Sequence, residues 1–281
     1  ITGEIKMTKI AKKDETKVSV NVINLEDDAG AGLEQIKSSD LKVPYMKLLQ
    51  SSSDETKKGS EKHIPNAEPG DLYIESTGQV FKGEDGVKAV QVYYANTWNE
   101  WSTREAPAES KLPAPIVHTE NIMHLTTKQG TKDILKSDQY RVIEDTGNHF
   151  VILLDKGYNL IGKAIIPMAI SKKKVSKFWN TCIQNQKQPK ADGSGTYTPA
   201  SFGQIYNLGS KSEKSKAGDL YFNFSVDFDR VIDSKSPKEV DVYMAGKKAY
   251  EDFQNWDMTS SNPEGTSVAL IEVKSEEDTP F

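Results

Sequence analysis

Alternation of apolar and polar positions is the strongest pattern in the chain, and it predicts β-strands. The pattern is clearest over 220–229, where every second residue is apolar. The same period recurs over 87–94, and the apolar run 160–166 is typical of a buried strand. Further strands are expected at 72–74 and within 200–208. Most of the middle of the chain is therefore predicted to be β-structure.

A hairpin is predicted between residues 139 and 154. Segments 139–144 and 149–154 are rich in strand-forming residues, and between them lies Asp145-Thr146-Gly147-Asn148. These four are turn-forming residue types. We expect the chain to reverse at 145–148.

The apolar period becomes helical after Ser171. The apolar positions are spaced i, i+3, i+4, i+7 and i+8, at Val175, Phe178, Trp179, Cys182 and Ile183. This spacing predicts an amphipathic helix, with Ser171 as its N-cap and an end before Pro189. A second helix is expected over 240–257.

Together these elements predict a mainly β chain with a few helices, of the α+β class. An OB-fold-like, partly open β-barrel with long inserts fits them, followed by a flexible acidic C-terminal tail. The expected division is a weakly structured N-terminal arm (1–40), an OB-like domain (41–257) and the tail (258–281). No internal repeat of 20 to 50 residues is visible.

The net charge of −5 is unevenly distributed along the 281 residues. From residue 251 onward there are eight acids and one lysine, whereas the other 250 residues hold 35 basic and 33 acidic residues. Within those, segment 169–219 holds nine lysines and three acids. A basic middle followed by an acidic end is the charge pattern that a function must account for.

The sequence contains no transmembrane or secretory signature. No apolar run approaches the roughly 20 residues that a bilayer requires, and the first residues are polar, unlike a signal peptide. The single cysteine, Cys182, excludes an internal disulfide framework. A reducing cytosol is therefore expected, with no membrane partner.

Motifs for catalysis are absent, so we expect a protein that is not an enzyme and that uses no cofactor or metal. There is no Walker loop, no Gly-x-Gly-x-x-Gly, no Gly-x-Ser-x-Gly and no His-Glu-x-x-His. Cys182 lies on the apolar side of its predicted helix, which favours an inert buried thiol. Asp227 and Asp229 share one strand face, where solvated carboxylates are commoner than metal ligands.

The basic middle of the chain is interleaved with aromatic residues, a mixture that suits single-stranded nucleic acid. Lysines neutralise phosphates and release counterions, and aromatic rings stack on bases of any kind. The candidate DNA-binding residues here are Lys172, Lys173, Lys174, Lys177, Trp179, Lys187, Lys190, Tyr197, Phe202 and Tyr206. The alternative is a solvated lysine face over core aromatics, and helix periodicity alone accounts for Trp179.

A second candidate stacking group comprises Trp98, Trp101 and Arg104, and core packing is again the alternative. The acidic end of the chain is a candidate docking peptide, in which a phenyl ring fills an apolar pocket and carboxylates meet basic residues. Its proposed partner-binding residues are Glu276, Glu277, Asp278, Pro280 and Phe281. Such a tail also competes with DNA for the protein's own basic surface.

Segment 276–281 resembles the acidic tip of bacterial single-stranded DNA-binding proteins, with Thr279 in place of the usual isoleucine. The body resembles a family of phage single-stranded DNA-binding proteins instead. The similar stretches are 43–50 (VPYMKLLQ), 68–73 (EPGDLY), 98–101 (WNEW), 168–180 (MAISKKKVSKFWN) and 243–250 (YMAGKKAY).

The resemblance implies an oligonucleotide-binding barrel that coats single-stranded DNA without sequence preference. It further implies a role in phage DNA replication or recombination, in the cytoplasm of the infected bacterium. The tip would recruit replication proteins such as a polymerase, helicase or primase. Two alternatives remain open: a structural or virion-associated phage protein whose lysines are only surface, and a double-stranded nucleic-acid binder.

Overall fold

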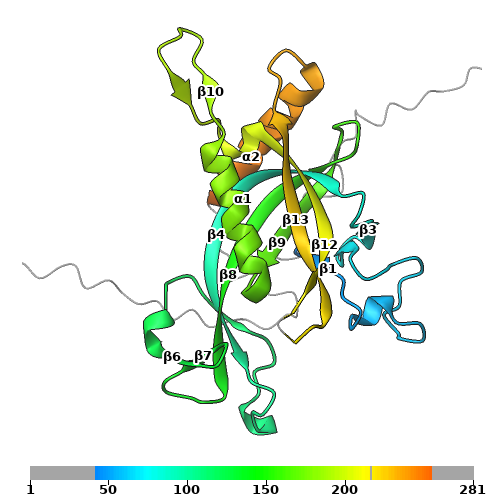
Figure 1. The fold of residues 1–281 in the computed structure, drawn as a ribbon, viewed down its shortest axis with the longest axis vertical. Coiled ribbons are helices and arrows are strands. Elements are labelled where there is room, and N and C mark those ends of the chain that lie inside the picture. Colours follow the sequence, from blue (N-terminus) through cyan, green and yellow to red (C-terminus); the bar gives the residue numbers. More distant parts are fainter. Residues whose placement is uncertain (1–41, 216, 255–281) are drawn as a thin grey trace, which may run out of the picture. The chain divides into compact units, whose positions relative to one another are not determined.

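An eight-stranded antiparallel sheet organises the chain in the computed structural model, which describes residues 42–215 and 217–254 (Figure 1). The predicted arm 1–40 and tail 258–281 lie outside the described residues. The strand order is β13 (Leu220–Val231), β12 (Gln204–Lys214), β4 (Val87–Ser102), β8 (Arg141–Leu154), β7 (Lys132–Leu135) and β6 (Thr126–Gln129). In addition, β5 (Ile116–His118) pairs with β4, and β9 (Leu160–Met168) pairs with β8.

The remaining elements are short apart from two helices. A three-stranded sheet contains β1 (Met46–Leu48), β2 (Leu72–Ile74) and β3 (Gln79–Phe81), and a two-stranded one contains β10 (Gln188–Pro189) and β11 (Thr196–Tyr197). The helices are α1 (Lys173–Asn185) and α2 (Pro237–Gln254). Single 3₁₀ turns are η2 (Asp54–Thr56), η3 (Ala108–Ser110), η4 (Met123–Leu125), η5 (Ile170–Lys172) and η6 (Ser201–Gly203).

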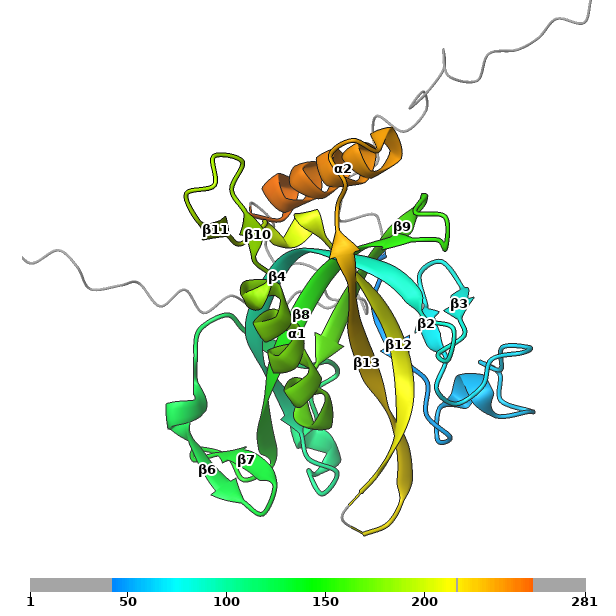
Figure 2. The ribbon, with the colours of Figure 1, turned by 45° about the horizontal axis from the view of Figure 1, so that its top comes forward.

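The main sheet is buried on both faces, each under one helix (Figure 2). Val151 and Leu153 of β8 point into a core shared with Trp179 of α1, whereas Phe150 and Ile152 point into a core shared with Val242 of α2. Burial on both sides explains why 150–154 is a continuous apolar run rather than an alternating one.

The sheet stops short of a closed barrel, because β9 and β13 do not pair with each other in the described chain. Segment 43–50 spans the interval between them. Ile165 of β9 donates its backbone N–H to the Pro44 carbonyl (2.9 Å). On the other side, the Gln50 side-chain amide accepts from the Phe222 N–H (2.9 Å) and donates to the Phe222 carbonyl (3.0 Å). The Gln50 side chain thus satisfies both the N–H and the carbonyl of Phe222, as a paired strand would.

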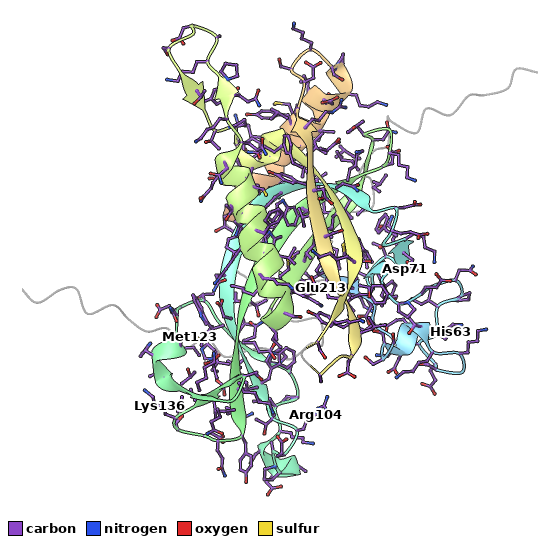
Figure 3. The ribbon with its side chains drawn as sticks, viewed as in Figure 1. His63, Asp71, Arg104, Met123, Lys136 and Glu213 are labelled. Carbon is purple, nitrogen blue, oxygen red and sulfur yellow. The ribbon has the colours of Figure 1, made fainter. Side chains whose placement is uncertain are left out.

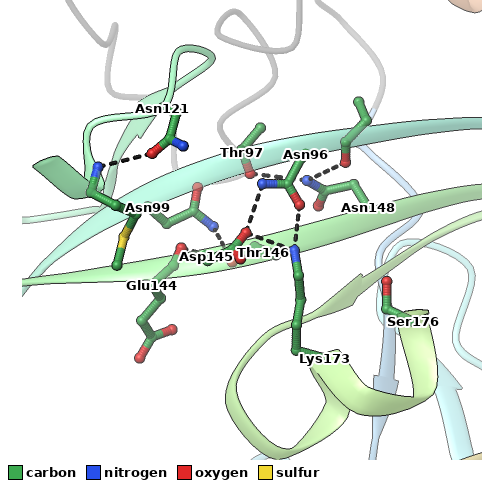
Figure 4. Close-up of polar contacts among 12 residues, drawn as sticks. Asn96, Thr97, Asn99, Asn121, Glu144, Asp145, Thr146, Asn148, Lys173 and Ser176 are labelled. Carbon is green, nitrogen blue, oxygen red and sulfur yellow. Dashed lines mark hydrogen bonds and ion pairs between the residues drawn. The ribbon is translucent and has the colours of Figure 1, made fainter. Parts of the chain in front are cut away.

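The predicted turn at 145–148 is wrong: these residues lie in the middle of β8, which pairs with β4 without interruption there. Each polar side chain finds a partner that is remote in sequence (Figure 4). Asp145 accepts from Lys173 (2.6 Å), Thr146 accepts from Asn99 (3.2 Å), and Asn148 donates to Thr97 (3.0 Å). At Gly147 an added Cβ would lie 2.5 Å from Ser176 Oγ, so the glycine serves close packing of α1 rather than chain reversal.

The prediction of a mainly β chain with long inserts and helices is confirmed, and both predicted helices exist. Their starts differ. Lys172, not Ser171, is the N-cap of α1, and no side chain caps the helix, because η5 leads directly into it. Helix α2 begins at Pro237 rather than at residue 240, consistent with the preference of proline for a first helical turn.

Candidate nucleic-acid interface

The outward side of α1 is basic and lacks acids: its 13 residues, KKVSKFWNTCIQN, contain three lysines and no carboxylate. Val175, Trp179 and Ile183 are buried against the sheet. Lys177 is exposed, and the adjacent Phe178 exposes 54% of its surface. An apolar ring of that exposure beside a cation is available for contact with a flat ligand.

A short hairpin continues this side of the molecule past the end of α1. Strands β10 and β11 pair Gln188 with Tyr197 and Pro189 with Thr196, and Figures 1 and 2 show the hairpin projecting beyond the helix. Tyr197 exposes 48% of its surface, and Lys187 and Lys190 are exposed on the same hairpin. The Lys187 ammonium donates to Thr198 Oγ1 (2.6 Å) but meets no carboxylate in the described chain.

We call Lys177, Phe178, Lys187, Lys190 and Tyr197 together the α1 face. Four of the five are predicted interface residues. The helical apolar spacing includes Phe178, so the sequence leaves both base stacking and core packing open for this ring. Successive helix residues are roughly 100° apart, so Phe178 lies to one side of the buried line of Val175, Trp179 and Ile183. That offset is the signal in the sequence that could have identified it.

Trp179 and Tyr206 do not belong to this face, because both are completely buried. The Trp179 ring stacks on His149 with a centroid distance of 4.6 Å, and its edge meets Tyr206 at 5.9 Å. Neither ring can stack on a base without opening the core, so the core alternative holds for both. Phe202 is half-buried against Tyr243 and Tyr250 under α2, away from α1.

His149 is the polar centre of the core under α1. Its Nδ1 lies 2.5 Å from Gln91 Oε1, and its Nε2 lies 2.8 Å from Ser176 Oγ. Gln91 Nε2 donates to Asn180, which leaves Gln91 Oε1 as the acceptor for Nδ1–H and makes Nε2 the acceptor for the Ser176 hydroxyl. Burial, reinforced by nearby Lys173, lowers the pKa of His149 to about 3, so the ring is neutral at physiological pH.

The three lysines that begin α1 already have partners within the protein. Lys172 is half-buried over the Phe224 ring, with its nitrogen 5.5 Å from the ring centroid, and burial lowers its pKa. Lys173 pairs with Asp145 of β8 at 2.6 Å. Lys174 pairs with Glu213 of β12 at 2.6 Å. These lysines connect the start of α1 to three strands, β13, β8 and β12, so they are not a free cationic patch.

Glu213 lies beside the first turn of α1 (Figure 3) and is an anionic centre that is not among the predicted interface residues. Its carboxylate also accepts from Tyr221 (2.7 Å) and Asn223 (3.1 Å). The hydrogen bond from Lys174, with that from Tyr221, lowers the pKa of Glu213 to about 2. An acid between Lys211 and Lys214 in a lysine-rich segment was the available sequence signal.

The second predicted group is divided by the sheet. Trp98 and Trp101 are three residues apart on β4 and therefore point to opposite faces. Trp98 is half-buried opposite Asp145, on the side of α1, whereas Trp101 is 40% exposed on the other side. Arg104 is exposed in the insert 103–140, apart from α1 in Figure 3. Of this group, Trp98 alone shares a side of the sheet with the α1 face.

The other candidate chemistry resolves into structural contacts. Asp229 pairs with Lys88 (2.9 Å) and accepts from the Tyr158 hydroxyl (2.9 Å). Cys182 is half-buried, and burial raises the pKa of its thiol. Across residues 42–215 and 217–254 there is no grouping of three His, Cys, Asp or Glu side chains suited to a metal ion. The predicted docking residues Glu276, Glu277, Asp278, Pro280 and Phe281 lie outside the described residues.

Within the described part of the chain, neither helix is both long and apolar enough to cross a membrane.

In comparisons with known proteins, the model of the Pam3 phage gp34-like protein family matches residues 13–259. No curated protein matches the chain. No solved structure matches it either.

Proposed function

The chain belongs to the Pam3 phage gp34-like protein family and is a bacteriophage protein, and from that premise we propose that it binds single-stranded DNA during phage replication or recombination. It would coat unwound strands without sequence preference. The family match does not name an activity, so the proposal depends on the chemistry of the α1 face.

The observation behind the proposal is the pairing of exposed rings with unopposed cations on that face. Phe178 and Tyr197 expose 54% and 48% of their surfaces. Lys177 adjoins Phe178 on α1, Lys187 and Lys190 lie on the hairpin that carries Tyr197, and none of the three lysines has a carboxylate partner in the described chain. Lysines attract phosphates, and a stacked ring contributes about 1–3 kcal/mol per base. Only unpaired bases offer their faces to such rings, which favours single strands over duplexes.

The acidic end of the chain completes the proposal from the sequence alone. Eight acids against one lysine after residue 250 oppose the basic α1 face in charge. We propose that this tail recruits replication proteins, with Phe281 as the apolar anchor and Glu276, Glu277 and Asp278 as the charged part.

Binding of oligo-dT and of a matched duplex, followed by fluorescence anisotropy at two salt concentrations, tests the proposal. Changing Lys177, Lys187 and Lys190 together to Ala should weaken binding and flatten the salt slope by about 2, since each neutralised phosphate contributes about 0.7 on single strands. Phe178→Ala combined with Tyr197→Ala should lower affinity by about 1–3 kcal/mol per ring and leave the slope unchanged.

A matched control removes three exposed lysines elsewhere, Lys58, Lys62 and Lys235, and should leave the slope as it is. Equal affinity for the duplex would favour the double-stranded alternative. Absence of binding to either ligand would favour a virion-associated role and would exclude the proposal.

A further inference from the structure

Four hydrogen-bond donors or cations from three elements converge on the carboxylate of Glu213. Oε2 receives Lys174 Nζ from α1 (2.6 Å), Tyr221 Oη from β13 (2.7 Å) and Asn223 Nδ2 from β13 (3.1 Å). Oε1 lies 3.7 Å from Lys211 Nζ of β12. Two ammonium groups, a hydroxyl and an amide around one anion form a complete anion site, filled by a side chain of the protein itself.

The amide donor, Asn223, is held in place independently of Glu213. Asn223 is completely buried and also donates to the Ser171 carbonyl in η5, which leads into α1 (3.2 Å). Tyr221 and Asn223 lie two apart on β13, so their side chains share a face, and they pair with Glu213 and Lys211 on β12. The strand register therefore keeps Tyr221 and Asn223 on one face beside Lys211, and the Ser171 contact holds the amide if the carboxylate leaves.

The carboxylate has a route out of this arrangement. Its side chain is 16% exposed, and those of Lys174 and Lys211 are 60% and 58% exposed, so the site opens to solvent. Rotation about the side-chain bonds of Glu213 would carry the carboxylate out without moving the backbone.

The site also adjoins the α1 face. Lys174 precedes Lys177 by three residues and Phe178 by four, and both spacings place side chains next to each other on a helix surface. A strand that stacks on Phe178 would therefore bring a neighbouring phosphate within reach of Lys174.

We propose that Lys174, Lys211, Tyr221 and Asn223 form a subsite for one backbone phosphate of single-stranded DNA, and that Glu213 occupies this subsite in the free protein. The inference rests on the proposed function and deepens it. A phosphodiester carries one negative charge, as the carboxylate does, and presents oxygens to the same donors. Binding exchanges one anion for the other, so Glu213 restrains affinity and keeps the donors ordered until DNA arrives.

The test compares Glu213→Gln with Glu84→Gln, which removes the same charge from an exposed residue with no ion pair in the described chain. Glutamine keeps the size of the side chain and an acceptor for Tyr221 and Asn223, but it no longer holds the lysines. Glu213→Gln should bind oligo-dT three- to tenfold more tightly, with a salt slope steeper by about 0.7 to 1.4, because one or two lysines become available to phosphates. Glu84→Gln should leave the slope unchanged.

Lys174→Ala supplies the second measurement, made in both backgrounds as a double-mutant cycle. It should have little effect in the wild-type protein, where Glu213 already engages Lys174, and should abolish most of the gain in Glu213→Gln. Thermal unfolding of each variant checks that it is folded at the assay temperature.

Three outcomes are distinguishable. A steeper slope for Glu213→Gln alone, reversed by Lys174→Ala, supports the subsite. Equal slopes for Glu213→Gln and Glu84→Gln, with oligo-dT still bound and still sensitive to the α1 face, would overturn the subsite and leave the proposed function intact. If the wild-type protein does not bind oligo-dT, both proposals fail.

Discussion

At the scale of single residues, His149 shows how a polar side chain is accommodated in the core. Both ring nitrogens are hydrogen-bonded, one face stacks on Trp179, and the neutral form is the one that fits. Protonation would place a charge beside Ser176 with no carboxylate of the described residues hydrogen-bonded to the ring, and would turn Nε2 from an acceptor into a second donor. The residue therefore couples the fit of α1 on the sheet to pH.

This coupling predicts a loss of stability in mild acid. The pKa of His149 is lowered from 6.5 to about 3 in the folded protein, so the unfolded chain takes up a proton first as the pH falls. The stabilisation is complete above about pH 6.5 and is lost towards pH 3, at up to about 1.4 kcal/mol per pH unit. Urea unfolding of the wild type between pH 7.5 and 4.5 should show this slope.

His149→Gln removes the titrating group and should flatten the dependence, whatever its effect on stability at pH 7.5. His63→Gln, at a half-buried loop position, serves as the control and should retain the wild-type slope. Identical slopes for His149→Gln and wild type would mean that protonation of His149 is not linked to folding.

Below about pH 4.5 Glu213 adds a second loss of stability, because its folded pKa of about 2 lies under its ordinary value of 4.5.

At the scale of elements, α1 combines a core-forming side and an interface side within adjacent residues. Trp179 is fully buried, whereas Phe178 is half exposed. Trp179→Ala should destabilise the protein by about 3–5 kcal/mol through the cavity that it leaves. Phe178→Ala should change the free energy of unfolding by less than about 0.5 kcal/mol while reducing affinity for oligo-dT. Denaturant unfolding and anisotropy of the two variants check the assignment, which a large loss of stability in Phe178→Ala would contradict.

Much of this architecture is predictable from the sequence, because period and burial agree in most elements. The alternation over 220–229 becomes β13, and the helical spacing after Ser171 becomes α1. At the two ends of the alternation the period does not predict burial. Leu220 and Phe228 are 67% and 40% exposed, although they are in phase with the buried residues of the strand. Period alone does not indicate where a strand leaves the core.

The predictions that the structure overturns share one physical cause, which is pairing between residues far apart in the sequence. Asp145, Thr146 and Asn148 have turn propensity, but partners on β4 and α1 satisfy them within a straight strand. Likewise Lys173 and Lys174 appear free in the sequence, and only the fold brings Asp145 and Glu213 to them. Composition therefore identified the basic segment, whereas the choice of its available residues required the structure.

At the scale of the whole molecule, the positive charge is divided into a bound part and an available part. Segment 169–219 has nine lysines and three acids, but Lys173 and Lys174 are paired with carboxylates. Lys177, Lys187 and Lys190 of this segment meet no carboxylate in the described chain and belong to the α1 face, and the largest excess of acid lies after residue 250. Competition between these two oppositely charged regions is the expected determinant of how affinity depends on salt.

That competition yields the last prediction. Deleting residues 275–281 should raise affinity for oligo-dT at low salt, because three acids no longer compete with phosphates, and the gain should shrink near 0.15 M salt, where the Debye length is about 8 Å. Changing Glu276, Glu277 and Asp278 to their amides should reproduce this gain in DNA affinity without shortening the chain.

Phe281→Ala should leave DNA affinity unchanged while weakening capture of phage or host replication proteins, since it removes the proposed apolar anchor and no side-chain charge. Anisotropy titrations and pull-downs with purified replication proteins measure the two effects separately. If the deletion instead abolished DNA binding, the tail would be part of the binding surface rather than its competitor.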